Sequence, residues 1–76
     1  MNSGMLWYDN NQQVNLIKRI QTAATYFSVK YGVKPEVCFV HPSMLAEENI
    51  GVLGMEIRKN SMIRPNYFWV GMRKAT

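Results

Sequence analysis

One amphipathic segment, residues 11–31, constrains the fold of this chain more than any other feature. Apolar residues recur in it at spacings of three and four, which places them on one stripe of an α-helix. Lys18, Arg19, Thr22 and Lys30 fall off this stripe, and we expect them to face water. The stripe is formed by Val14, Ile17, Ile20, Ala24, Phe27 and Tyr31, and Leu16 and Ala23 widen it.

Residues at both ends of this segment favour helix termination. Asp9, Asn10 and Asn11 have side chains that cap the free N–H groups at a helix N-terminus. Gly32 suits the left-handed position that follows a helix, and Pro35 lies three residues beyond it. We therefore predict one long helix over residues 11–31.

The remaining segments predict strands. Residues 36–40 and 67–72 are rich in β-branched and aromatic residues, and residues 52–58 resemble them. We expect the segments 52–58 and 67–72 to form an antiparallel hairpin. Residues 5–8 form either a short edge strand or an arm packed on the body, and residues 42–48 form one or two helical turns.

The resulting order, (β)αβ(α)ββ, predicts an α+β fold. One long helix would pack on a small three- or four-stranded, mostly antiparallel sheet. The chain has 76 residues, which is the size of one small domain. We therefore treat residues 1–76 as a single domain, with a core that is marginal for its length.

The last strand has no polar face. Tyr67 and Trp69 share one of its faces, whereas Phe68, Val70 and Met72 share the other. A helix about 10–12 Å wide covers only one face of a sheet, and a sheet with one face in water normally alternates apolar and polar residues. We therefore expect a cover on the second face. The N-terminal segment together with residues 42–51, a second copy of the chain, a different protein or a flat ligand could each supply it.

From this second face we predict a small non-enzymatic interaction module that acts as a homodimer or on a larger protein. Aromatic residues are enriched at the centres of protein interfaces. The candidate partner-binding residues are Tyr67, Trp69, Trp7 and Tyr8.

The distribution of charge supports an alternative function, nucleic-acid binding. The formal net charge is +4, and residues 57–76 contain bases but no acid. A basic hairpin with aromatic rings between its charges resembles the surfaces that bind single strands. A charged rim that keeps the protein soluble is the competing interpretation. The candidate nucleic-acid-binding residues are Arg58, Lys59, Arg64, Arg73 and Lys74.

Cysteine use and apolar runs bear on the compartment. Cys38 is the single cysteine, so no disulfide forms within the chain, and a free thiol fits a reducing compartment such as the cytoplasm. The apolar runs are far shorter than the roughly 20 residues of a membrane helix. We therefore expect a cytoplasmic protein with no membrane partner.

We predict no catalytic residue, no metal site and no cofactor. Cys38 and His41 are three residues apart, so on a strand their side chains point to opposite faces. Ser43 lacks the flanking glycines of a nucleophile elbow. Glu47 and Glu48 are adjacent, which keeps them from facing one another on a helix. An enzyme with a site shared between subunits around His41 is a third, weaker alternative.

Overall fold

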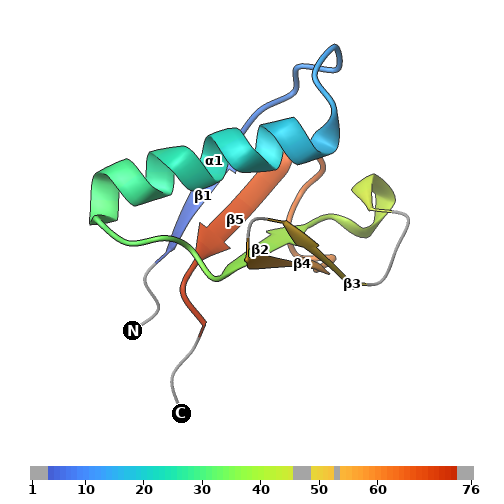
Figure 1. The fold of residues 1–76 in the computed structure, drawn as a ribbon. Helices are drawn as coiled ribbons and strands as arrows, with labels where there is room; N and C mark the ends of the chain where they lie inside the picture. Colours follow the sequence, from blue (N-terminus) through green and yellow to red (C-terminus); the bar gives the residue numbers. More distant parts are fainter. Residues whose placement is uncertain (1–3, 46–48, 53, 74–76) are drawn as a thin grey trace.

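The computed structural model of this chain describes residues 4–45, 49–52 and 54–73, and it confirms the α+β class (Figure 1). A long helix lies across one face of a five-stranded mixed sheet. The elements in chain order are β1 (Gly4–Tyr8), α1 (Leu16–Tyr31), β2 (Val37–Val40), the short 3-10 helix η1 (Pro42–Met44), β3 (Asn49–Val52), β4 (Met55–Lys59) and β5 (Tyr67–Gly71).

The strands lie in the order β1-β5-β2-β4-β3, so β2 is the central strand. The β1–β5, β5–β2 and β4–β3 pairs are antiparallel, whereas β2 and β4 are parallel. The expected hairpin between residues 52–58 and 67–72 is therefore wrong, because β2 lies between β4 and β5. The hairpin is formed instead by β3 and β4. Its turn contains Gly54, whose φ of 78° is left-handed and easily adopted by glycine.

The N-terminal segment is an edge strand, one of the two alternatives expected from the sequence. β1 pairs with β5 over its whole length, from Gly4 opposite Gly71 to Tyr8 opposite Tyr67. This pairing widens the sheet to five strands, one more than the largest sheet predicted.

Helix α1 begins five residues later than predicted, because its cap is Asn15 rather than residues 9–11. The Asn15 side-chain oxygen accepts a hydrogen bond from the Lys18 backbone N–H at 2.8 Å. Asp9 and Asn11 instead close local turns, each accepting from the N–H two residues ahead. The C-terminus is as predicted: Gly32 has a φ of 75°, and its N–H donates to the Ser28 carbonyl.

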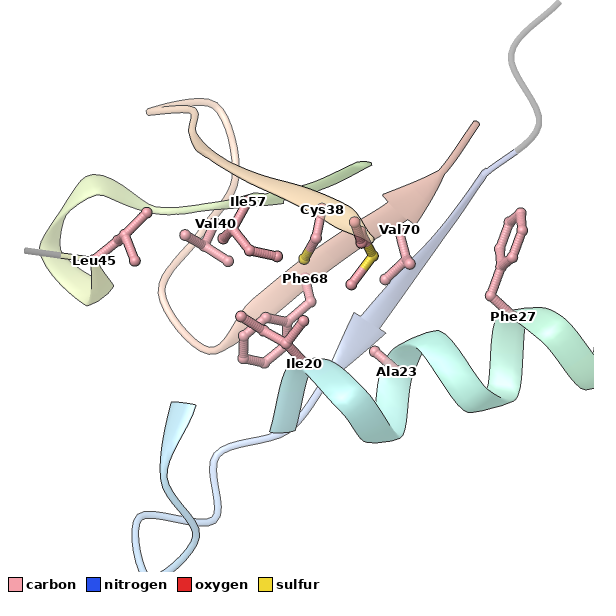
Figure 2. Close-up of a cluster of buried hydrophobic side chains, with 10 residues drawn as sticks. Ile20, Ala23, Phe27, Cys38, Val40, Leu45, Ile57, Phe68 and Val70 are labelled. Carbon is pink, nitrogen blue, oxygen red and sulfur yellow. The ribbon is translucent and has the colours of Figure 1, made fainter. Parts of the chain in front are cut away.

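The core lies between α1 and the near face of the sheet (Figure 2). Helix residues Ile20, Ala23 and Phe27 pack there against side chains from the central strands. The segment after η1 closes one end of the same core with Leu45, which is 5% exposed. The strand residues of the core are Cys38, Val40, Met55, Ile57, Phe68 and Val70.

Arg19 is buried, which contradicts the expectation that it faces water. Its Nη1 donates to the Asp9 carbonyl oxygen at 3.3 Å and to Asn66 Oδ1 at 3.4 Å. Asn66 has a φ of 69° and precedes β5. Arg19 therefore joins the first turn of α1 to the end of β1 and to the start of β5, a role that helical periodicity alone does not indicate.

Candidate binding face

The face of the sheet turned away from α1 carries a group of aromatic and aliphatic side chains, which we call the open face. It consists of Leu6 and Tyr8 from β1, Phe39 from β2, and Tyr67 and Trp69 from β5. Leu6 is 58% exposed and Tyr8 is 52% exposed, while the three other residues are half-buried. Three neighbouring strands thus build one continuous apolar surface.

The strand register places these side chains in rows across the sheet. Leu6 lies opposite Trp69, and Trp69 lies opposite Phe39. In the parallel pair, Phe39 lies opposite Arg58 of β4. The Phe39 and Trp69 rings are 5.6 Å apart at an angle of 47°, and the Tyr8 and Tyr67 rings are 4.8 Å apart at 51°. One row therefore runs from an aliphatic side chain through two rings to a guanidinium.

The Trp69 indole lies on Gly4. A Cβ at position 4 would overlap Cζ2 of Trp69 and would lie 2.6 Å from Cε2 and 2.7 Å from Cη2. Since Cε2 and Cη2 flank Cζ2 in the ring, these nearly equal distances place the ring face down on residue 4. The opposite ring face is turned outward, as in the flat aromatic platforms of binding proteins.

Within the residues that the structure describes, neither of the segments named above as covers lies over this face. The N-terminal segment is a strand of the same sheet, and its Leu6 and Tyr8 enlarge the open face. Met44 and Leu45 of the 42–51 segment pack into the core on the α1 side. Residues 46–48 lie outside the described part of the chain.

The structure brings together three of the four predicted partner-binding residues: Tyr8, Tyr67 and Trp69. Trp7 lies on the other face of β1, where it stacks on Tyr26 of α1 with a centroid distance of 4.3 Å. Leu6 and Phe39 belong to the open face but were not predicted as site residues. Because side chains alternate between the two faces of a strand, Leu6 and Tyr8 share the face opposite to that of Trp7, and this spacing is a sequence signal for Leu6.

The predicted basic residues that the structure describes do not form one cluster. Arg58 and Arg73 share Glu56, at 3.8 Å and 3.0 Å respectively. Lys59 ends β4, and Lys74 lies outside the described residues. Much of the positive charge at this end of the face is therefore balanced by one carboxylate.

Arg64 lies at the other end of β5. It lines a pocket of about 310 Å³ beside the open face, together with Leu6, Met62, Ile63 and Tyr67. Within residues 4–45, 49–52 and 54–73, the Arg64 guanidinium makes no ion pair. At this pocket the apolar surface therefore meets a cation that has no ion-pair partner among the described residues.

Cys38 and His41 both make contacts that support the fold. Cys38 is fully buried in the core, and burial raises its pKa to about 12. His41 caps η1: its Nδ1 accepts from the Ser43 N–H at 3.0 Å and lies 2.8 Å from Ser43 Oγ. Among the described residues, no three His, Cys, Asp or Glu side chains are grouped as a metal site would require.

In the described part of the chain, no helix has the length and apolar character needed to cross a bilayer.

No family model, curated protein or solved structure matches the chain. Its function is therefore inferred from its own residues.

Proposed function

We propose that this chain is a small non-enzymatic interaction module that binds a protein surface through its open face. One observation carries this proposal: Leu6, Tyr8, Phe39, Tyr67 and Trp69 form a continuous surface on the side of the sheet opposite α1. Contiguous exposed apolar surface on a soluble protein typically marks an interaction site. Tyr, Trp and Phe are also the residue types enriched at interface centres.

The chemistry of the open face favours a protein over a strongly charged ligand. Glu56 lies between Arg58 and Arg73 and balances part of their charge. A mixed rim around an apolar centre is the usual anatomy of a protein interface. Burial of the half-exposed rings would remove apolar area from water, which stabilises a complex by about 25 cal/mol per Å² before the costs of association.

The test compares two variants, each with one added cysteine, on opposite sides of the molecule. Leu6→Cys places a thiol on the open face, and Val29→Cys places one on the outer side of α1, where Val29 is 81% exposed. Cys38 serves as an internal blank, because its buried thiol has a pKa of about 12 and should not react with a maleimide near neutral pH.

Maleimide labelling is followed in dilute protein, in concentrated protein and in cell extract. We expect labelling of Leu6→Cys to slow in concentrated protein or in extract, while Val29→Cys labels at an unchanged rate. Equal rates for both reporters under all three conditions would refute the open face as a binding surface.

Single-strand nucleic-acid binding is a second candidate, favoured by the placement of two arginines. Arg64 and Arg73 lie beyond opposite ends of β5, with Tyr67 and Trp69 on the strand between them. Single-strand binders combine cationic contacts with stacking rings in this way. If three phosphates were contacted, affinity for a fluorescent ten-nucleotide strand should fall roughly 20-fold from 50 to 200 mM salt. Arg64→Ala should weaken this binding more than Lys30→Ala on α1, and equal effects of the two changes would contradict this candidate.

A further inference from the structure

We infer that the protein bound by the open face is a second copy of this chain, packed face to face about a two-fold axis that runs along β2. This inference rests on the proposed function and names the partner. It comes from the order of the strands and from the rows of side chains that the register creates.

Strand β2 is the middle of five strands, with the ring-bearing β5 on one side and the charged β4 on the other. A half-turn about an axis parallel to β2, placed between two facing sheets, exchanges these two sides. The β4 strand of the second copy then lies over β5 of the first, and the reverse contact forms by symmetry. Such an isologous contact buries the same patch on both copies.

The row through Trp69, Phe39 and Arg58 complements itself under this operation. Phe39 of each copy lies near the axis, and Arg58 of each copy lies over Trp69 of the other. The Trp69 ring face is turned outward because the indole lies face down on Gly4. The Arg58 side chain is 53% exposed, and its contact with Glu56 at 3.8 Å is long. A guanidinium over an indole face is a favourable cation–π pair.

The neighbouring row consists of Gly71, Val37 and Glu56. Gly71 and Val37 are buried within each copy, and Glu56 pairs with Arg73 at 3.0 Å, so this row offers a second copy less surface than the Trp69 row does. A two-fold axis perpendicular to the strands would set Arg58 against Arg58 if it passed through the Trp69 row, and against Glu56 if it passed between the two rows. Only the axis along β2 places Arg58 over the Trp69 ring face.

The size of the face sets the expected strength of the dimer. Five strands spaced about 4.8 Å apart, each rising about 3.3 Å per residue over four or five residues, give a projected area of roughly 400 Å². This is about half of the roughly 800 Å² per partner in a standard interface. Contacts of this size are typically transient, so self-association should be measured up to several hundred micromolar.

The first experiment is sedimentation equilibrium of the wild-type chain and two arginine variants. We expect a reversible dimer that Arg58→Ala weakens about 5- to 30-fold, because two equivalent cation–π contacts are lost. Arg58→Lys should weaken it less, since the charge remains. Lys30→Ala is the matched control on α1, where Lys30 lies 5.4 Å from the Tyr31 ring centroid, and it should leave dimerisation unchanged.

The second experiment locates the axis with a bismaleimide whose spacer is about 10 Å long, the separation of packed sheets. Position 39 of one copy would face position 39 of the other across that separation, so the thiols in Phe39→Cys would lie within reach of the spacer. Thiols in Leu6→Cys would be about 22 Å apart, because β1 lies two strands from β2. We expect covalent dimers from Phe39→Cys, and no more from Leu6→Cys than from the wild-type chain with its buried Cys38.

Each outcome bears on the inference. A monomer at every concentration overturns the inference that the partner is a second copy. Crosslinking through Leu6→Cys in place of Phe39→Cys overturns it as well. If the monomer's Leu6→Cys thiol is protected in cell extract, the proposed function stands with a different protein as partner. If that thiol is protected neither in concentrated protein nor in cell extract, the proposed function fails as well. Salt-sensitive oligonucleotide binding by a strict monomer would establish the nucleic-acid candidate instead.

Discussion

Replacing Gly4 with alanine should destabilise the fold, although alanine is ordinarily tolerated in a strand. Gly4 is the first residue of the edge strand β1, and Trp69 lies face down on it. An alanine Cβ would overlap the indole and would lie 2.6 Å from Cε2. Since the indole is rigid and packs beside Phe39, either the ring or the edge strand has to move.

The size of the effect follows from two opposing contributions. Forcing an extra methyl group into a packed site costs about 1–3 kcal/mol. Alanine also restricts the unfolded chain more than glycine does, which recovers about 0.4–1 kcal/mol. The net loss should be about 1–2 kcal/mol. A 76-residue domain has a free energy of unfolding of about 4–11 kcal/mol, so the loss is a substantial fraction of the total.

Gly51→Ala is the matched control, because Gly51 lies on the opposite edge strand and a Cβ there would meet the Met55 carbonyl oxygen at an ordinary 3.9 Å. Urea unfolding followed by far-ultraviolet circular dichroism should show a midpoint about 1–2 M lower for Gly4→Ala, given a slope near 1 kcal/mol/M. Gly51→Ala should leave the midpoint unchanged or slightly raised.

A double-mutant cycle tests the cause of the loss. In a Trp69→Val background the ring is absent, so Gly4→Ala should cost almost nothing. Equal midpoints for Gly4→Ala and Gly51→Ala, or an undiminished penalty in the Trp69→Val background, would refute the packing of the indole on residue 4.

Three further predictions concern stability. Arg19→Met should lower the free energy of unfolding by about 1–3 kcal/mol in urea titrations, because the Asp9 carbonyl and Asn66 Oδ1 lose their buried donor; a neutral result would refute the bridging role. Asn15→Ala should cost about 1 kcal/mol through loss of the helix cap, seen as a lower melting temperature, and an unchanged temperature would contradict it. Burial raises the pKa of Cys38 from 9.0 to about 12, so the folded state favours the neutral thiol. The contribution of this thiol to the free energy of unfolding is complete below about pH 9 and decreases as the pH rises toward 12. Relative to Cys38→Ala, the free energy of unfolding of the wild-type chain should fall by about 1.4 kcal/mol at pH 10. Parallel pH profiles for the two proteins would contradict this.

Sequence patterns predicted the elements whose signals are local. The C-terminus of α1 follows from Gly32, which adopts the left-handed conformation at little cost. The helix start was misplaced because several Asn and Asp side chains compete to cap it. Asn11 closes its own turn, whereas Asn15 directly precedes the first helical residue and caps α1. The choice among such neighbours depends on where the helix must meet the sheet.

Strand pairing was predicted less well because it depends on contacts far apart in sequence. The sequence predicts one strand over residues 52–58, but the left-handed Gly54 turns the chain within this segment, which produces β3 and β4. The parallel pairing of β2 with β4 has no local signal. One indication of it does exist: residues 37–40 are apolar on both faces, as expected for a strand at the centre of a sheet.

The apolar strands alone do not identify what covers the open face. Part of the expected second-face cover comes from within the sheet itself, since Val37 on this face is only 5% exposed and Trp69 covers Gly4. This internal packing depends on register, because a shift of one residue would turn Trp69 toward α1. Leu6 and Tyr8 remain more than half exposed at the edge strand. Because α1 covers only the other face of the sheet, the outward faces of the rings on β5 and β2, together with the edge residues of β1, are the surface that a partner would bury.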